Sequence, residues 1–265
     1  MKRLTSSLGA VYTVLLALFM LFPVLAIVPA SLGVDELLRF PPRGLTLRWY
    51  EQVLSDRDWL DSAWLSLRLG LGAAVLSTLL GLALCLYAYH YRNLPRGVQG
   101  LLTLPLWMPH VVLATGLFTV LLPVNLLGSE WVLVLVNASL ALPIGGLLLL
   151  NAGAAIEPSL WTAATSLGAT PLTALRTVIL PLLSLALVSA LILGFHSAWD
   201  ETVFAVFVGP QLTPTLSSRI YAYLGQNVTP AIAAVATLIV AMAVIVTLVL
   251  LSLRRRVRER PHYLH

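Results

Sequence analysis

Two neighbouring carboxylates, Asp200 and Glu201, are the residues of this sequence best suited to attract a cation. They follow the apolar run 178–199. Charge inside a membrane is costly and usually functional, so acids at such a place can attract a polyamine or a metal cation. The alternative is a solvated helix end that has no role in binding. The neighbouring Trp199 is either an anchor at the membrane surface or a wall that stacks on an ammonium group.

Two histidines accompany these residues as candidates. His110 lies in the segment PLWMPHVV, where two prolines break a helix and Trp107 lies between them. Broken helices tend to line cavities, because their freed backbone groups need water or protein partners. His196 precedes Asp200 by one helical turn. Packing or hydrogen bonding is the favoured interpretation for both histidines, since isolated histidines make poor metal sites. The candidate residues of a solute path are therefore Trp107, His110, His196, Trp199, Asp200 and Glu201.

The reactive residues that the chain lacks exclude several other functions. Cys85 is the single cysteine, so an intrachain disulfide or a cysteine-based metal cluster is excluded. Lys2 is the single lysine, and no glycine-rich turn precedes it, as a phosphate-binding loop requires. We therefore expect no catalytic residue, no metal, no bound cofactor and no ATP hydrolysis on this chain, which is not an enzyme.

The composition predicts a membrane protein. Of the 265 residues, 59% are hydrophobic and only 10% are charged, and the mean hydropathy is +0.92. Soluble domains have about 45–50% apolar and about 25% charged residues, so this chain has too little charge for a soluble enzyme. The same values exclude intrinsic disorder. A net charge of +5, mostly from arginine, indicates a membrane surface rather than a nucleic acid as the partner.

Six apolar segments are long enough to cross a bilayer, which takes about 20 residues. They are apolar at almost every position, which favours helices over the alternating pattern of barrel strands. Small residues in the second segment, among them Gly70, Gly72 and Gly81, allow close helix packing. We expect an all-α polytopic protein with a single transmembrane domain over 1–265, an outer loop at 33–62 and an inner loop at 151–177. The expected spans are 8–32, 63–87, 98–122, 131–150, 178–199 and 232–253.

The distribution of charge predicts the orientation. With the N-terminus inside, the inner segments contain ten basic residues: Lys2, Arg3, Arg92, Arg96, Arg176 and the five arginines from Arg254 to Arg260. Their only acids are Glu157 and Glu259, whereas the outer segments hold nine acids and five arginines. Cytoplasmic segments carry the excess of basic residues, so we expect both termini in the cytoplasm. The Arg254–Arg260 cluster is then an anchor at anionic lipid.

The inner loop has the features of a helix, a sharp turn and a second helix. Residues 160–167 favour a helix, which Gly168 can end in a left-handed conformation. Thr170 suits the cap of a second helix and Pro171 its first position. Such a hairpin either fits a groove on a partner protein or lies on lipid headgroups. The residues expected on one face of the first helix are Leu160, Ala163, Ala164 and Leu167.

This segment resembles the cytoplasmic coupling loop of the inner-membrane permease subunits of bacterial ABC importers, the binding-protein-dependent transport family. The family pattern is Glu-Ala-Ala, three residues, Gly and, after a gap, Ile-x-Leu-Pro. Here Thr162-Ala163-Ala164 precedes Gly168, and Val178-Ile179-Leu180-Pro181 follows with the family's spacing of thirteen residues from Gly to Pro. Thr162 replaces the usual Glu and removes a charge that can pair with the ATPase. The resemblance assigns ATPase coupling to Thr162, Ala163, Ala164, Leu167, Gly168, Ala169, Pro171, Leu180 and Pro181.

Four further segments, 45–70, 105–118, 197–210 and 213–224, are similar to the smaller permease subunit of spermidine/putrescine importers. The resemblance implies the type I importer permease fold in the bacterial inner membrane and half of a translocation path for a polyamine. Relatives of that group move ferric iron, thiamine, phosphonates or other small solutes, so these remain alternatives. The implied partners are an ATPase dimer that binds ATP and Mg, a second permease subunit and a periplasmic or lipid-anchored solute-binding protein.

Two other classes of membrane protein fit the sequence less well. A secondary transporter driven by an ion gradient often has carboxylates near the middle of its spans, and no expected span has an acid at its centre. A membrane scaffold that transports nothing would not need the inner hairpin.

Overall fold

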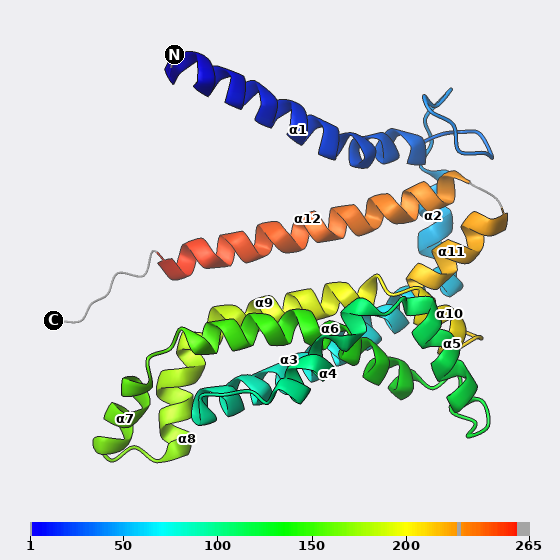
Figure 1. The fold of residues 1–265 in the computed structure, drawn as a ribbon. Helices are drawn as coiled ribbons and strands as arrows, with labels where there is room; N and C mark the ends of the chain where they lie inside the picture. The colour runs from blue at the N-terminus through cyan, green and yellow to red at the C-terminus, as the bar shows by residue number, and fades with distance from the viewer. Residues whose placement is uncertain (1, 227–228, 259–265) are drawn as a thin grey trace. The chain divides into compact units, whose positions relative to one another are not determined.

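The computed structural model describes residues 2–226 and 229–258, and most of these residues are helical (Figure 1). Over this part of the chain the β pairing is an isolated bridge between Gly33 and Leu45. The expected all-α class is confirmed. The elements are α1 (Lys2–Ser31), α2 (Arg48–Ser55), α3 (Arg57–Tyr91), α4 (Arg96–Trp107), α5 (His110–Leu121), α6 (Glu130–Ala154), α7 (Pro158–Ser166), α8 (Pro171–Ala174), the π turn η1 (Leu175–Ile179), α9 (Leu180–Trp199), α10 (Val203–Val208), α11 (Leu216–Gln226) and α12 (Pro230–Arg258).

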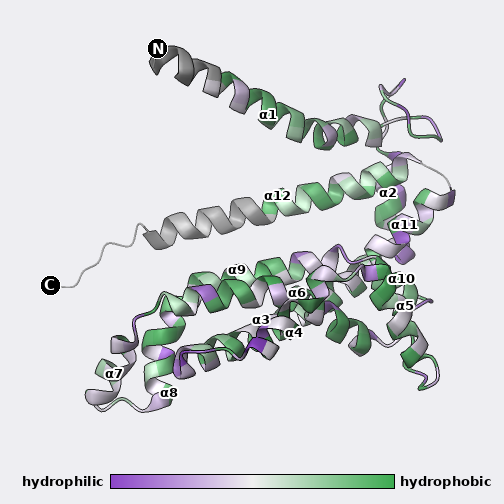
Figure 2. Ribbon diagram, in the orientation of Figure 1, coloured by the Kyte–Doolittle hydropathy of each residue, from purple (hydrophilic) through white to green (hydrophobic). Residues whose placement is uncertain are grey.

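Four helical segments of the described chain are long and apolar enough to cross a membrane. They are Val11–Ser31 of α1, the whole of α3, the whole of α6, and Pro171–Asp200, which contains α9. Figure 2 shows apolar residues along most of α1 and α9. On α12, the apolar stretch with described side chains is Pro230–Ile245, which is shorter than a span. The chain is therefore a polytopic membrane protein, and six crossings remain a prediction.

The expected third span, 98–122, is not one straight helix. The chain breaks after α4 at Met108 and Pro109 and bends by 105° into α5. Met108 is extended, with φ −100° and ψ 133°, because a proline disfavours helical geometry in the residue before it. Twelve residues make a helix of about 18 Å, so neither half alone spans a bilayer. The break at the prolines was expected, and a single crossing by the bent pair remains a prediction.

The described residues divide into two compact units, with the boundaries inside α3 and α11. One unit comprises the residues up to Leu60 and those from Ala222 onward, and in it α12 packs against α1 and α2. Its interior contains Trp49, whose indole N–H donates a 2.7 Å hydrogen bond to the Gly33 carbonyl. The rings of Trp59 and Tyr223 lie 5.0 Å apart in the same unit.

The other unit, Asp61–Tyr221, contains the loop and the acids that the sequence singles out. Small residues bring its long helices together, as expected for α3. A Cβ placed at Gly81 of α3 would lie 3.1 Å from the Cα of Gly146 on α6. A Cβ at Gly194 of α9 would lie 3.2 Å from the Cα of Ala74 on α3. Helices in lipid pack through close backbone approach at small residues such as glycine and alanine. The helices α3, α6 and α9 are packed in this way, and together they are called the frame.

A second group of contacts surrounds the bent pair. The short α10 packs against α5, and Phe204, Ala205 and Val208 share a buried cluster with Leu65 and Leu133. Arg68 of α3 pairs with Glu130 of α6, with Nη2 3.3 Å from Oε1, and both side chains are half-exposed. These contacts hold α5, which follows the α4–α5 break, and α10, which follows α9, against the long helices α3 and α6.

Candidate functional site

The inner hairpin has the predicted turn. Helix α7 ends at Ser166, and Gly168 follows with φ +88°, a left-handed conformation that strains any residue with a Cβ. The Gly168 N–H donates to the Thr165 carbonyl at 3.0 Å, and the Ala169 N–H donates to the Ala164 carbonyl at 3.1 Å. These bonds satisfy carbonyls that the end of the helix would leave free. The backbone of the turn is therefore fixed by its own hydrogen bonds.

The second arm starts as the sequence predicts. Thr170 is extended, and its side-chain oxygen accepts a 3.2 Å hydrogen bond from the N–H of Thr173. Pro171 occupies the first turn of α8, where its missing N–H costs nothing. Helical conformation then continues from Pro171 to Asp200. The hairpin is thus directly continuous with a helix long enough to cross the membrane.

A π turn joins this arm to α9 at Leu180 and Pro181. The Leu180 N–H donates to the Leu175 carbonyl, five residues back, instead of the carbonyl four residues back. Pro181 has no N–H with which to continue the α-helical pattern, so a change in hydrogen-bond register at this place is physically reasonable. Single π turns inside α-helices are frequent at functional sites. The π turn was not predicted from the sequence, although Pro181 indicates an irregularity at this place.

The base of the hairpin is buried and its tip is exposed. Ile179 and Leu183 belong to a buried cluster with Cys85 of α3 and Leu149 of α6. By contrast α7 has no buried residue, and the side chain of Leu167 at the turn is 89% exposed. The apolar side chain of Leu167 at the tip is therefore available for contact with a partner protein or with lipid headgroups.

The residues expected on one face of α7 are mostly available for contact. Leu160, Ala163 and Leu167 are exposed, and Ala164 is half-buried. Thr162 is also exposed, and its hydroxyl donates a 3.4 Å hydrogen bond to the Pro158 carbonyl. Thr162 therefore contributes no charge to this surface, unlike the Glu of the family pattern. Ala169 is half-buried, and Pro171 is exposed.

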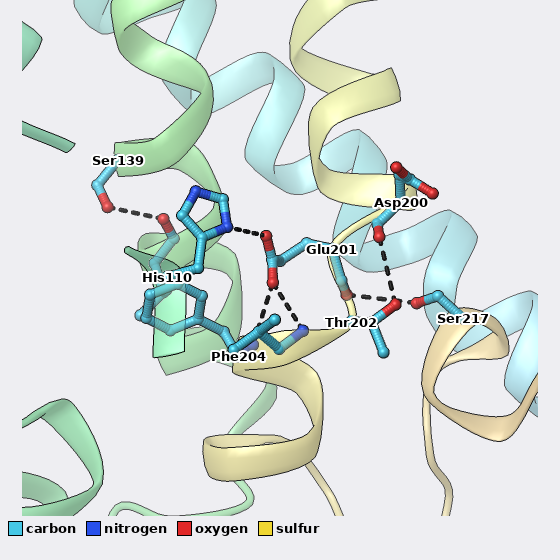
Figure 3. Close-up of polar contacts among 9 residues, drawn as sticks. His110, Ser139, Asp200, Glu201, Thr202, Phe204 and Ser217 are labelled. Atoms are coloured by element: carbon cyan, nitrogen blue, oxygen red, sulfur yellow. Dashed lines mark hydrogen bonds and ion pairs between the residues drawn. The ribbon is translucent and has the colours of Figure 1, made fainter. Parts of the chain in front are cut away.

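The acids Asp200 and Glu201 are adjacent in sequence but lie in different surroundings (Figure 3). The Glu201 side chain is 8% exposed, and its Oε1 accepts hydrogen bonds from the N–H groups of Val203, at 2.8 Å, and Phe204, at 3.1 Å. Glu201 therefore caps α10. Asp200 ends α9 and is exposed, and its side chain points away from that of Glu201. The two acids, which are neighbours in the sequence, are therefore not a pair in the structure.

Glu201 also reaches across to the bent pair. Its Oε2 lies 3.1 Å from Nδ1 of His110, the first residue of α5, and this imidazole is 46% exposed. The His110 ring lies 5.9 Å from that of Phe204. His110 thus lies between a carboxylate and an aromatic ring, and its role in the solute path remains a prediction. The contact itself was not predicted, because it joins residues far apart in the chain.

The other candidate residues do not join this group. Trp107 is 82% exposed at the end of α4, and His196 is exposed on α9. Trp199 is half-buried, with its ring 5.5 Å from that of Phe195 on the same helix. Over residues 2–226 and 229–258, no three His, Cys, Asp or Glu side chains are grouped so as to hold a metal ion. The solute-path roles of Trp107, His196 and Trp199 remain predictions.

Comparison with known proteins shows the family to which this chain is related. Residues 75–259 match the family described as binding-protein-dependent transport system inner membrane component. The spermidine/putrescine transport system permease protein PotC of Haemophilus influenzae is 28% identical over 236 residues, which cover 88% of this chain and 90% of that protein. The putrescine transport system permease protein PotI of Escherichia coli is 28% identical over 228 residues, with 82% and 80% covered.

One further relative and one solved structure are also similar to this chain. The sulfoquinovosyl glycerol transport system permease protein SmoH of Agrobacterium fabrum is 31% identical over 245 residues, which cover 89% of this chain and 85% of that protein. The fold resembles a chain in the crystal structure of a bacterial ABC transporter that imports the acidic polysaccharide alginate. The TM-score is 0.66 at 18% identity, with 96% of both chains covered. This chain belongs to the family of binding-protein-dependent transport system inner membrane components and is a multi-pass permease subunit of an ABC importer.

Proposed function

We propose that this chain forms half of the translocation path of an ATP-driven importer and receives the energy of ATP hydrolysis through the hairpin of α7 and α8. ATP and Mg are bound by a separate ATPase dimer. A second permease subunit completes the path, and a periplasmic or lipid-anchored binding protein delivers the solute. Thr162, Ala163, Ala164, Leu167, Gly168 and Ala169 form the docking arm and its turn, and Pro171, Leu180 and Pro181 lie in the arm that leads to α9.

The continuity of the hairpin with α9 is the observation that supports this proposal most strongly. The turn at Gly168 is held by its own hydrogen bonds, and the arm after it stays helical, through the π turn at Leu175–Ile179, into a helix of membrane-spanning length. A movement of the tip is therefore passed to α9 rather than absorbed by a flexible loop. A partner drives such a movement only if its contacts differ between two states of the permease.

We propose a polyamine as the solute. The support comes from relatives named for spermidine and putrescine transport, and from Asp200, an exposed carboxylate at the end of α9. Since Glu201 is held by two backbone N–H groups and His110, Asp200 is the acid of the pair that is free to attract a cation. The relative named for sulfoquinovosyl glycerol transport supports a different small solute as the alternative.

We further propose that both termini face the cytoplasm. The excess of basic residues on the segments assigned to the inside supports this orientation. The hairpin then lies on the side where the ATPase is found. Of the proposed anchor Arg254–Arg260, Glu259 and Arg260 lie outside the described residues, as does the C-terminal end.

Uptake by the reconstituted importer tests the proposed function. The chain is assembled in proteoliposomes with its proposed ATPase, second permease and binding protein, and uptake of radiolabelled spermidine is measured. We expect uptake that requires ATP inside the vesicles and persists without any ion gradient. Uptake driven by a proton or sodium gradient alone would show a secondary transporter instead. ATP-driven uptake of another solute, with none of spermidine or putrescine, would reject the polyamine and retain the importer.

A further inference from the structure

A pocket of about 880 Å³ lies within the Asp61–Tyr221 unit, where the C-terminal ends of α3 and α6 meet the first half of α4. It is separate from both the hairpin tip and the His110–Glu201 contact. Its polar lining comes mainly from Arg92, Arg96, Asn93, Gln99 and Asn151. Its apolar lining includes Leu102, Leu147 and Leu150. The volume falls in the range of small-ligand sites, about 300–1,000 Å³.

In the part of the chain that the structure describes, the pocket is lined by positively charged side chains and by no negatively charged one. Among the described residues, neither the Arg92 nor the Arg96 guanidinium has a hydrogen bond or an ion pair, and the lining includes no Asp or Glu. The acid Glu157 lies near Tyr89, which also lines the pocket, but its carboxylate accepts a hydrogen bond from Ser159. Paired guanidinium groups bind phosphate oxygens well, because they offer several donors in a planar fork.

The start of α4 adds to the preference for an anion. This 12-residue helix begins at Arg96 after Pro95, no side chain caps its first N–H groups, and its first turn contains no acid. Free N–H groups and the helix dipole favour negative charge at such an end. Arg96, the first residue of α4, lines the pocket, whereas the N–H of Gln99 one turn later is already bonded to the Pro95 carbonyl. Two independent features, the arginines and the helix start, therefore favour the same kind of ligand.

We propose that this pocket binds a phosphate group, held by Arg92, Arg96 and the start of α4. Two sources share this chemistry: the headgroup of an anionic phospholipid and a soluble phosphate compound. Basic pockets between membrane helices on the cytoplasmic side bind anionic headgroups, and the orientation proposed above places this pocket on that side. Leu102, Leu147 and Leu150 supply apolar surface beside the arginines, which suits an acyl chain.

Native mass spectrometry of the full-length protein, released from neutral detergent, tests the lipid source. The protein is titrated with phosphatidylglycerol and, separately, with phosphatidylcholine. We expect a phosphatidylglycerol adduct that resists collisional activation, and an affinity about tenfold or more lower in Arg92→Gln/Arg96→Gln, because a hydrogen bond to a charged group contributes on this scale. Arg43→Gln/Arg57→Gln, which also removes two positive charges but at exposed arginines outside the pocket, should retain the adduct.

A second variant that keeps both arginines tests the pocket even if the double variant does not fold. A side chain at Gly100, which lines the pocket, would meet no atom within 4 Å of its Cβ, so Gly100→Phe can fill the pocket without a clash in the backbone. It should weaken the phosphatidylglycerol adduct as well. Melting in inorganic phosphate, compared with chloride at equal ionic strength, tests the soluble source. Stabilisation by phosphate that is lost in Arg92→Gln/Arg96→Gln would assign the site to a soluble phosphate group. Equal adducts in all variants, with no effect of phosphate, would overturn the proposal.

Discussion

The hydroxyl of Tyr89, near the end of α3, donates a 3.2 Å hydrogen bond to the carbonyl of Glu157, the residue that precedes α7. This bond ties the entry of the hairpin to a helix that is packed against α6 through glycine. Trp161 and Leu175, one from each arm, pack against the same buried cluster as Tyr89. The hairpin is therefore attached to the frame at its base while its tip stays exposed.

Replacing Tyr89 with Phe should loosen this attachment. The loss of one hydrogen bond removes about 0.5–1.5 kcal/mol, so the base of the hairpin should open more often. We expect faster amide hydrogen exchange at the start of α7 and a lower ratio of solute-stimulated to basal ATP hydrolysis. Tyr87→Phe is the matched control, because the Tyr87 hydroxyl has no hydrogen bond to a described residue. Equal effects of the two changes would show that the Tyr89 bond has no part in coupling.

Replacing Gly168 with Ala should disturb the turn. A left-handed conformation costs a residue with a Cβ about 1–2 kcal/mol, whereas Gly168 adopts φ +88° without strain. Solute-stimulated ATP hydrolysis should fall while insertion into the membrane is preserved. Gly225→Ala on α11 provides the control, since a Cβ there also meets open space and the backbone is helical. Normal coupling in Gly168→Ala would show that the turn tolerates a side chain.

The cap of α10 should depend on the oxygen of Glu201 more than on its charge. Glu201→Ala leaves the N–H groups of Val203 and Phe204 without their acceptor, which costs about 1–3 kcal/mol when such groups are buried. Glu201→Gln keeps an oxygen in place of Oε1. We therefore expect a clearly lower melting temperature for Glu201→Ala than for Glu201→Gln. Equal melting temperatures would contradict a capping role.

Asp200 should influence the transport of a cation through its charge. An exposed carboxylate lowers the energy of an approaching cation over about a Debye length, near 8 Å at physiological salt. Asp200→Asn should therefore slow polyamine uptake, most strongly at low ionic strength, and leave the affinity of the binding protein unchanged. Glu51→Gln removes an exposed acid of α2 and should have little effect. Uptake by Asp200→Asn at the rate of the unmodified importer would remove the local support for a cationic solute.

The sequence was sufficient for those parts of the fold that short-range chemistry determines. Gly168, Thr170 and Pro171 fix the turn because each acts on backbone groups within a few residues of itself. The long apolar helices can also be predicted from their own residues, because their composition decides whether they can lie in a bilayer. Pro109 likewise indicated the break in the third expected span.

Features that depend on distant parts of the chain were not predicted. The size of the bend at Pro109 depends on the packing of α5 against α10, and the His110–Glu201 contact exists only after that packing. Adjacent acids look equivalent in a sequence, but Glu201 turns to cap α10 and Asp200 turns to the exposed side. The pocket of Arg92 and Arg96 also arises only where three helices meet.

Photocrosslinking at the hairpin tip tests most directly whether the ATPase docks there. A photoreactive benzoyl-phenylalanine replaces Leu167, which is 89% exposed, in the assembled importer. The control carries it in place of Leu212, which is 99% exposed on the segment between α10 and α11. Docking of the ATPase on the hairpin predicts a covalent adduct with the ATPase after irradiation from position 167 and none from position 212. An importer that yields no ATPase adduct from position 167, or yields it equally from both positions, would contradict coupling through this hairpin.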